Sequence, residues 1–327
     1  MRFRINCHFI LGMLLTLAAR GAELRLGMVG LDTGHVIAFT KILHDRTAKD
    51  HVPGARVVGA VKAGSPDIES SWSLVDGYTE RLRTEFGVTL YDSIEALAKN
   101  VDGVLIESVD GRPHLEQARA VILAGKPLYI EKPIAASLRD TLEIFALARK
   151  HRVAVFSSSA LRFAGETLAV RDGSIGRVMR AETGSPAKLE PTHPDLFWYG
   201  IHGVESLFTV MGVGIESVTR LSSETDAIVV EGRWQGGRVG VFRERKGYGG
   251  RAIGEKGEAN VGKFDGYAPL VSTIVTFFQT GISPVPERET VEIIAFMEAD
   301  ALSKARGGVP VRISEVMEKA GGKMGAR

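Results

Sequence analysis

Cysteine is almost absent from this 327-residue chain, which has Cys7 alone, so neither an internal disulfide nor a cysteine-based zinc site can form. An excess of one charge is absent as well: 41 basic and 39 acidic residues are dispersed, and the densest basic run spans only 243–246. Without a strong basic field, nucleic acid is not an expected partner. The chain also has no internal repeat and no low-complexity linker, so its parts are expected to pack closely with a cleft between them.

Metal-ligand spacing is missing too. His35 and His51 are not spaced like ligands of one metal ion, and neither are His44 and His151. Since no cysteine is available to complete such a set, the sequence predicts no metal site.

The first 22 residues have the order of a secretory signal peptide. Arg2 and Arg4 precede a short apolar run at 9–19, and Gly21 offers a small residue for cleavage. The run is too short for an ordinary membrane span, which takes about 20 apolar residues. We therefore predict a signal peptide at 1–22, an exported, periplasmic protein and no stable membrane span. A misassigned start codon or an unusual first helix is the alternative interpretation.

The length and the hydrophobic content of 44% are typical of a soluble protein with two domains. From residue 24 to residue 157, short apolar strands alternate with helices, which indicates a parallel, doubly wound sheet covered on both faces. Strands are predicted at 24–30, 56–61, 89–90, 101–107, 128–130 and 153–157, and helices at 36–43, 74–86, 93–99, 113–124 and 138–150.

The pattern changes after about residue 160. A helix at 195–211 precedes a strand-rich stretch at 215–262, in which the turn 235–237 (Gln-Gly-Gly) predicts a hairpin. Helices near 268–280 and 287–306 follow. This half is predicted to be an α+β domain with a largely antiparallel open sheet and helices on one face.

The first strand leads into a glycine-containing turn. A dinucleotide turn has the pattern G-x-G-x-x-G, in which glycines let the pyrophosphate approach the start of the helix. Gly30 fits the first position, but Asp32 stands at the second and His35 at the third, with Thr33 and Gly34 between them. The turn is consistent with nucleotide binding, and equally with Asp32 capping the following helix.

The end of the second strand bears on the choice of nucleotide. An acidic residue there would bind the ribose 2′-hydroxyl of NAD, and none is present. Lys62 and Ser65 suit a 2′-phosphate better, which favours NADP, while a surface lysine without a ligand is the alternative.

Three motifs resemble the Gfo/Idh/MocA oxidoreductases. The first covers 114–133, with a histidine opening a helix, then Ala-Gly-Lys, an apolar strand and Glu-Lys-Pro at 131–133. The second is the Arg-Phe pair at 162–163, and the third is the segment 199–205 around His202. The resemblance extends over the chain from residue 24, with departures: Trp198 and Glu205 replace two aspartates of the third motif, and 110–112 (Asp-Gly-Arg) replaces a Pro-Asn turn.

The resemblance implies a Rossmann domain at 23–158, a substrate and oligomerisation domain at 159–327, and a homo-oligomer formed through the second sheet. It implies Lys132 and His202 as the catalytic pair, with a cis bond between Lys132 and Pro133. The expected cofactor-binding residues are Gly30, Asp32, Thr33, Gly34, His35, Lys62, Ser65, Ser108, His114, Glu131, Lys132 and Arg162, and the expected substrate-binding residues are Lys132, Asp195, Trp198, Tyr199 and His202.

The catalytic pair has a chemical rationale. Lys132 follows a parallel strand at the edge where ligands of such sheets bind, so its ammonium can stabilise charge on a reacting oxygen. His202 can move a proton near neutral pH, and Glu205, on the same helical face, is the carboxylate best placed to orient it. A surface lysine and a buried structural histidine are the alternatives. His114 either binds the cofactor ribose or caps its helix.

These features predict an NAD(P)-dependent oxidoreductase that acts on CH–OH groups of a sugar-like small molecule. A tightly bound cofactor is expected, because free nicotinamide nucleotides are scarce outside the cytoplasm. Two alternatives remain open: an enzyme that cleaves glycosides through transient oxidation by bound NAD, and a binding protein that has lost catalysis.

Overall fold

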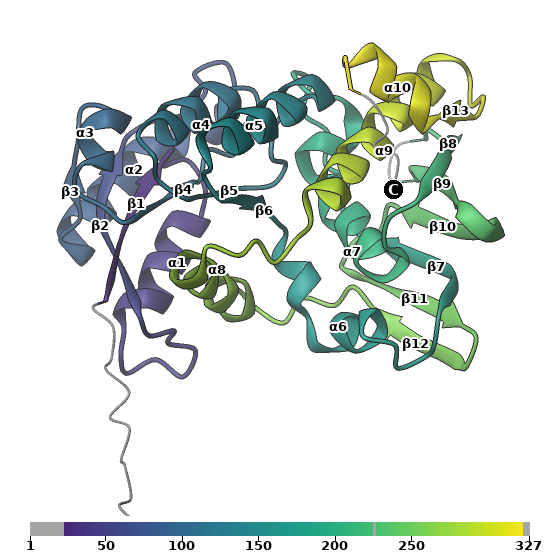
Figure 1. Ribbon diagram of the computed structural model, residues 1–327, viewed down its shortest axis with the longest axis horizontal. Coiled ribbons are helices and arrows are strands. Elements are labelled where there is room, and N and C mark those ends of the chain that lie inside the picture. Colours follow the sequence, from purple (N-terminus) through teal and green to yellow (C-terminus); the bar gives the residue numbers. More distant parts are fainter. Residues whose placement is uncertain (1–22, 225–226, 323–327) are drawn as a thin grey trace, which may run out of the picture.

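Two sheets organise the computed structural model, which describes residues 23–224 and 227–322 (Figure 1). The predicted signal peptide and Cys7 lie outside the described residues. The first sheet has the strand order β3-β2-β1-β4-β5-β6, and all of its pairs are parallel, as predicted. Its strands are β1 (Leu24–Val29), β2 (Ala55–Val61), β3 (Thr89–Leu90), β4 (Gly103–Ile106), β5 (Leu128–Ile130) and β6 (Val155–Ser157).

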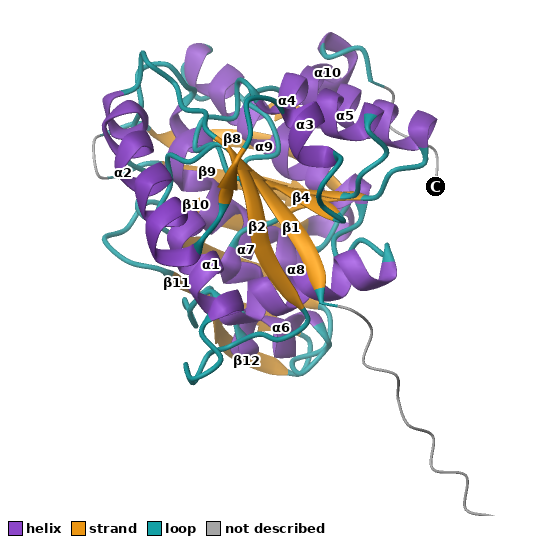
Figure 2. Ribbon diagram, turned by 90° about the vertical axis from the view of Figure 1, so that its left-hand side faces the viewer, coloured by secondary structure: helices purple, strands orange, loops and turns teal. Residues whose placement is uncertain are grey.

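Helices cover both faces of this sheet (Figure 2). One apolar cluster joins the sheet to α1 (His35–His44), α2 (Glu69–Phe86) and α8 (Ala268–Thr280). A second cluster, on the other face, contains α3 (Ile94–Ala98), α4 (His114–Leu123) and α5 (Leu138–His151). The doubly wound arrangement brings the carboxyl ends of β1, β4 and β5 together, which is where ligands of such sheets bind.

The second sheet is mixed, in the order β12-β11-β7-β10-β9-β8-β13. The predicted hairpin is confirmed, since β9 and β10 pair antiparallel on either side of a short turn. One pair, β7 with β10, is parallel, so the sheet is largely but not fully antiparallel. Its strands are β7 (Val178–Gly184), β8 (Ile215–Ser222), β9 (Val229–Trp234), β10 (Arg238–Arg243), β11 (Gly249–Gly254), β12 (Gly257–Val261) and β13 (Val311–Arg312).

Helices α7 (Ile201–Met211) and α9 (Glu287–Ala305) pack against the second sheet, and their buried residues share one apolar cluster with its strands. Two shorter helices, α6 (Gly165–Arg171) and α10 (Ile313–Lys319), were not predicted. Charged pairs such as Arg243–Glu182 and Arg251–Glu258 are solvent-exposed on the strands. The sheet therefore has a helix-covered apolar side and a charged side.

The predicted boundary at residue 159 needs a correction at α8. This helix was assigned to the second domain, yet it packs beside α1 on the first sheet, as Figure 1 shows. Leu270, Ile274 and Phe277 are almost fully buried there, and the ring of Phe278 fills the space beside Gly103 of β4. The chain thus returns to the first domain before it completes the second, and α8 shares that face with α1 and α2.

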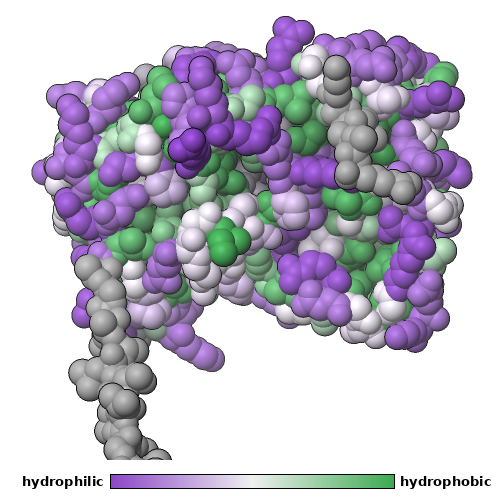
Figure 3. Space-filling view, viewed as in Figure 1, coloured by the Kyte–Doolittle hydropathy of each residue, from purple (hydrophilic) through white to green (hydrophobic). Residues whose placement is uncertain are grey.

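The surface is of mixed polarity. Hydrophilic residues are spread over both halves of the face shown in Figure 3, with hydrophobic ones between them. Among the described residues, none of the helices combines the length and the apolar character needed to cross a membrane.

Candidate functional site

A cavity of about 320 Å³ lies between the two domains, at the carboxyl edge of the parallel sheet. Both members of the predicted catalytic pair line it, one from each domain. The predicted site residues that line this cavity are Asp32, Thr33, Gly34, His35, Glu131, Lys132, Trp198, Tyr199 and His202. The predicted residues that do not line it are Gly30, Lys62, Ser65, Ser108, His114, Arg162 and Asp195.

Lys132 stands directly after β5. The bond between Lys132 and Pro133 is cis, as the resemblance implied. The lysine is only 6% exposed, and its Nζ lies 3.4 Å from Oε1 of Glu131. A buried ammonium with one carboxylate beside it is suited to stabilise negative charge on a bound oxygen atom.

His202 lies in the first turn of α7, and its Nδ1 is 2.8 Å from Oγ of Ser159. Burial, reinforced by the ammonium of Lys132, holds the pKa of His202 well below its usual value. The imidazole is therefore neutral near pH 7. The Nδ1–H can donate to Ser159 and leave Nε2 as a base, or the Ser159 hydroxyl can donate to Nδ1 and leave Nε2–H as an acid.

The prediction that Glu205 orients His202 is wrong. Its carboxylate instead accepts hydrogen bonds from the Ser158 hydroxyl, from the backbone N–H of Ser159 at 2.8 Å and from Nε of Arg162 at 2.8 Å. Glu205 thus fixes Ser159, and Ser159 contacts the imidazole. Arg162 was predicted to bind the cofactor, but it is 2% exposed and forms ion pairs with Glu205 and Glu289.

Asp195, predicted to bind substrate, does not line the cavity. Its carboxylate accepts hydrogen bonds from Arg220 at 3.0 Å and Lys304 at 2.7 Å, away from the cavity. One α-helix was predicted at 195–211, whereas η2 (Leu196–Gly200) is a π-helical turn that precedes α7. A wider turn rotates the residues before it relative to those after it, so Asp195 leaves the face of His202.

Aromatic side chains form much of the cavity wall. Trp198, Tyr199, Tyr248, Phe264 and Tyr267 all line it, and the hydroxyls of Tyr199 and Tyr248 are 3.0 Å apart. The rings of Tyr199 and Tyr248 meet that of His202 edge-on, with centroids 5.1 and 5.9 Å away. Flat apolar walls with a few polar groups suit a small ring that carries hydroxyls on its rim.

The turn after β1 departs from a pyrophosphate cradle. Gly30 has the positive φ of 82° that the first glycine needs, but a Cβ there would meet Oγ of Ser108, so its small size serves packing. Asp32, at the second glycine position, is 1% exposed and accepts hydrogen bonds from the Ser71 hydroxyl at 2.6 Å and the Val109 N–H at 3.0 Å. It neither caps α1 nor leaves the space that a second glycine provides.

The residues expected around the adenosine also bond to one another. Ser65, after β2, donates to Asp110 at 2.5 Å, and Arg112 reaches from the β4 loop to Asp67 with two bonds of 2.8 Å. Lys62 is paired with the exposed Asp76, and Ser65 keeps its hydrogen bond to Asp110 while it lines an open groove. These bonds link the loop after β2 to the loop after β4 at the edge of that groove.

His114 and Ser108 belong to the same internal network. His114 is fully buried, and its ring nitrogens lie 3.0 Å from the Pro133 carbonyl and 2.9 Å from the Ser108 carbonyl. The Ser108 hydroxyl is bonded to Gln117. His114 therefore joins two loops, and neither binds a ribose nor caps its helix. Taken together, the predicted cofactor residues outside the cavity are bonded within the protein.

No metal site was predicted from the spacing of histidines along the sequence. The structure brings His35, Glu107 and Glu131, hereafter the His–Glu–Glu cluster, within 4.8 Å of one another. Burial and the neighbouring Glu131 raise the pKa of Glu107 well above its usual value. Although burial alone would raise it, His35 and Lys132 lower the pKa of Glu131. The ligand atoms come from three separate strand ends, so spacing along the chain could not predict the cluster.

Sequence analysis missed Glu107, Ser159 and Tyr248. Glu107 ends a predicted buried strand, and a charged residue in that place was an available signal. Ser159 follows the last parallel strand within a run of serines, which gives no signal of its own. Tyr248 comes from the loop before β11, and only the fold brings it to His202.

Comparisons with known proteins agree with the fold. Residues 24–159 match the family described as "Oxidoreductase family, NAD-binding Rossmann fold", GFO_IDH_MocA. A 1,5-anhydro-D-fructose reductase of Ensifer adhaerens is 33% identical over 142 residues, 41% of this chain and 42% of that protein. Dehydrogenase aclE of Aspergillus oryzae is 30% identical over 164 residues, 48% of this chain and 42% of that protein. The chain therefore matches less than half the length of these curated relatives.

Solved structures resemble the whole described chain. A probable dehydrogenase from Thermotoga maritima has a TM-score of 0.69 at 20% identity, over 90% of this chain and 100% of that one. Scyllo-inositol dehydrogenase from Lactobacillus casei, solved with NAD(H) and scyllo-inositol, has a TM-score of 0.69 at 15% identity, over 89% and 99%. At these identities, the likeness shows a shared two-domain fold.

Proposed function

We propose that this chain is an enzyme acting on an oxygen-bearing carbon of a small, sugar-like molecule. The match of residues 24–159 to the Gfo/Idh/MocA oxidoreductase family supports this proposal. The observation that carries the proposal is the meeting of Lys132 and His202, one from each domain, in a single cavity with aromatic walls. A structural lysine and a structural histidine have no reason to meet there.

The two residues divide the chemistry at one substrate oxygen and the carbon that bears or adjoins it. His202, neutral and fixed by Ser159, takes a proton through Nε2 and later returns it. The ammonium of Lys132 donates to the oxygen and stabilises the negative charge that develops there. The closed, largely apolar walls strengthen this interaction by excluding water.

The substrate class follows from the lining of the cavity. Aromatic rings pack against the C–H faces of a saturated ring, and Tyr199, Tyr248 and Lys188 offer polar atoms to its hydroxyls. The names of relatives, an anhydro-fructose reductase and inositol dehydrogenases, support a polyhydroxylated ring. A cavity of about 320 Å³ is of the right order for one such ring.

A nicotinamide-dependent dehydrogenase or reductase of a CH–OH group, with NAD or NADP held tightly, is the second candidate. The family match and the NAD-bound structural relatives favour it. It requires the turn after β1 to open for the pyrophosphate, because Asp32 stands at the position of the second glycine there. Glycoside cleavage through transient oxidation needs the same opening.

A substrate panel tests the proposal. Purified protein is incubated with inositols, anhydro sugars, keto sugars and simple glycosides, with and without added NAD and NADP, and products are analysed by NMR in D₂O. Exchange of a carbon-bound proton, isomerisation or elimination without nucleotide supports the first candidate, and turnover only with nucleotide supports the second. Binding without any reaction across the panel would leave a binding protein as the better description.

Export and assembly are further proposals. The order of basic, apolar and small residues at 1–22 supports export, so the mature protein should begin at Ala22 or Glu23 on amino-terminal sequencing. An intact Met1 on soluble cytoplasmic protein would contradict this.

The second sheet supports pairing of two copies through its charged side, and light scattering measures whether the protein is larger than a monomer.

A further inference from the structure

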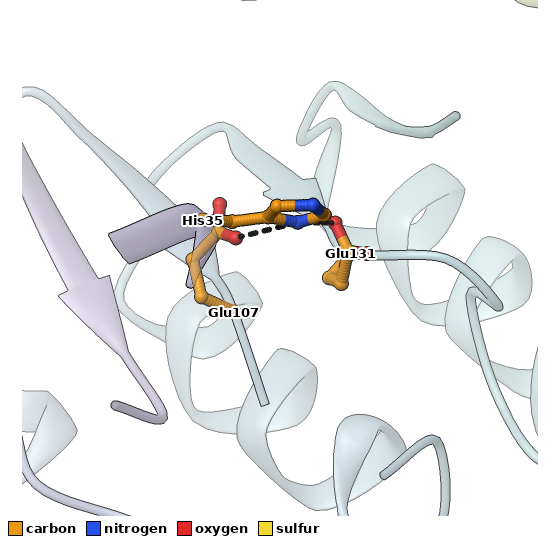
Figure 4. Close-up of side chains that lie close together, drawn as sticks. All are labelled: His35, Glu107 and Glu131. Atoms are coloured by element: carbon orange, nitrogen blue, oxygen red, sulfur yellow. Dashed lines mark ion pairs between the residues drawn. The ribbon is translucent and has the colours of Figure 1, made fainter. Parts of the chain in front are cut away.

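The His–Glu–Glu cluster lies at the floor of the cavity, where three strands of the first sheet end. His35 opens α1 after the turn that follows β1, Glu107 follows β4 and Glu131 follows β5. Figure 4 shows the imidazole between the two carboxylates. His35 and Glu131 also line the cavity beside Lys132 and His202, while Glu107 lies behind them. The cluster is therefore part of the cavity and not a separate surface feature.

The distances within the cluster are those of ligands around one ion. Nδ1 of His35 is 3.1 Å from Oε2 of Glu131 and 4.0 Å from Oε2 of Glu107. With metal–ligand bonds of about 2.0–2.2 Å, two ligands of one ion stand about 3–4 Å apart. The ring of His35 is held in place by stacking on Phe39, with centroids 5.1 Å apart, and by the edge of Tyr267 at 4.8 Å.

The cluster also contains polar atoms that no protein group satisfies. Glu107 is 0% exposed, and neither of its carboxylate oxygens has a hydrogen-bond partner. Oε1 of Glu131 has no hydrogen bond but lies 3.4 Å from Nζ of Lys132, and Nδ1 of His35 lies 3.1 Å from Oε2 of Glu131. Close approach without hydrogen-bond geometry is expected of acceptors directed at a common point. Buried carboxylates normally have partners, because their desolvation is costly.

Other buried carboxylates in the described part of the chain have such partners. Asp110 is bonded to Ser65 and Arg112, and Asp300 to Arg220. Glu205 is bonded to two serines and an arginine. Near the cluster, by contrast, Lys132 lies beside Glu131, and no donor among the described residues reaches Glu107. A divalent cation would give the unpartnered oxygens of Glu107 a partner.

We propose that His35, Glu107 and Glu131 bind one divalent first-row transition-metal ion, with Mn²⁺ and Zn²⁺ as the best candidates. One imidazole and two carboxylates favour these ions over Mg²⁺ and Ca²⁺, which take oxygen ligands. Three protein ligands leave coordination positions open, as in catalytic metal sites. Because two of the three ligands line the cavity, the open positions face the substrate space.

The ion would take part in the proposed reaction, and this role of the ion rests on the proposed function. A substrate with a carbonyl next to a hydroxyl would bind through its oxygens, and the ion would polarise the carbonyl as a Lewis acid. His202 then takes the proton of the adjoining carbon: the C–H bond breaks, an N–H bond forms, and the electron pair moves toward the carbonyl oxygen. Lys132 and the ion share the charge, and no external oxidant is required.

The metal itself is tested without substrate. The purified protein is stripped with a chelator, and Mn²⁺, Zn²⁺ and Mg²⁺ are titrated separately by calorimetry, with the bound ion counted by elemental analysis. One Mn²⁺ or Zn²⁺ per chain, a raised melting temperature, and Mg²⁺ at least about tenfold weaker are expected. Glu107→Gln keeps the shape of the side chain but removes the ligand charge, so affinity should fall by about 100-fold or more.

The matched control is Glu298→Gln, which neutralises a half-buried glutamate that is bonded to the Leu138 N–H far from the cavity. It should bind the ion like the wild type. The metal-free Glu107→Gln protein should melt no lower than the metal-free wild type, because Glu107 makes no hydrogen bond that the change would break. The proposal fails if no ion binds, or if Glu107→Gln binds it as the wild type does.

Activity then separates the two proposals. If one ion binds as described but the substrate panel gives no reaction, the metal site stands and the proposed function is wrong. If the metal-free protein turns a substrate over at the wild-type rate, the proposed function stands and the ion has no part in it. With Mn²⁺ bound, a change in its electron paramagnetic resonance spectrum on adding a hydroxy-ketone would show that the open positions take substrate oxygens.

Discussion

The two sides of the same sheet edge differ in how their buried polar atoms are satisfied. On the side of β2, Asp32, Ser65 and Asp110 are each bonded to another protein group. On the side of β5, Glu107 and Glu131 are equally buried but have oxygens without partners. Unsatisfied buried acceptors are rare in folded proteins and are concentrated where a ligand completes them. The contrast indicates that the ligand of this edge binds on the β5 side.

The largest effects on turnover are expected from substitutions of the catalytic pair, Lys132 and His202. Lys132→Ala removes the charge that stabilises the reacting oxygen, which should lower turnover by about 10²–10³. His202→Ala removes the proton acceptor and should lower turnover by about 10²–10⁴. Since both act on one substrate, the double variant should be much less impaired than the product of the two losses.

Steady-state rates on the best substrate of the panel measure these losses. Lys150→Ala and His151→Ala, at the exposed end of α5, are matched controls and should leave the rate unchanged. Wild-type turnover in either cavity variant would remove that residue from the mechanism.

On the β2 side, the burial of Asp32 lowers the stability of the folded protein in a way that depends on pH. Burial raises the pKa of Asp32 to about 6, although its bonds to Ser71 and Val109 act in the opposite direction. The folded protein therefore holds a proton that the unfolded chain releases near pH 4, so stability falls as pH rises from about 4 to about 6. Asp32→Asn removes this titration, and near pH 7 the variant should be more stable by up to about 3 kcal/mol.

Denaturant unfolding between pH 4 and pH 7.5 tests this difference. Asp172→Asn, an exposed aspartate paired with Arg171, is the control and should follow the wild-type curve. Parallel curves for the wild type and Asp32→Asn would mean that Asp32 is ionised throughout this range.

A smaller effect is expected at Ser159, which positions His202 without contacting the reacting atoms. Ser159→Ala removes the hydrogen bond to His202 and the one that Ser159 accepts from the Leu161 N–H, so kcat should fall about tenfold, while KM stays within about twofold. The alkaline limb of the kcat–pH profile should change as well, because the hydroxyl can stabilise either protonation state of the ring. Ser159→Thr retains the hydroxyl and should recover most of the rate, whereas Ser73→Ala, on the exposed face of α2, is a control.

Periodicity predicted most of the fold because local pattern and tertiary packing agree. The strand at Leu128–Ile130 has the predicted bounds, and the hairpin turn Gln235–Gly237 joins the expected strands. The errors arise where tertiary structure decides. The return of α8 to the first sheet leaves no mark in its own sequence, and the π-helical turn before α7 changes the face of Asp195.

In the candidate site, sequence motifs predicted the residues that stand within a motif. They did not predict the residues that only the fold brings together. Lys132 and His202 were found because each stands in a recognisable segment. Ser159 and Glu107 were missed because their roles depend on a partner more than 20 residues away. Residues such as Ser65 and His114 fit the family pattern by position, yet their side chains are bonded within the protein.

The smallest expected effect concerns nucleotide binding on the β2 side of the sheet edge. NAD and NADP should not stabilise the wild-type protein. A nucleotide at about 1 mM with a Kd near 10 µM would add roughly 2.7 kcal/mol and raise the melting temperature by several degrees. We expect a shift below about 1 °C, because Asp32 stands where the turn after β1 would need its second glycine. Asp32→Gly restores the second glycine of the turn and sharpens the test. A larger shift in this variant than in the wild type would identify the Asp32 side chain as the obstacle. A shift of several degrees in the wild type, after bound nucleotide has been excluded by absorbance, would show that the turn opens, and the nicotinamide-dependent candidate would then take precedence.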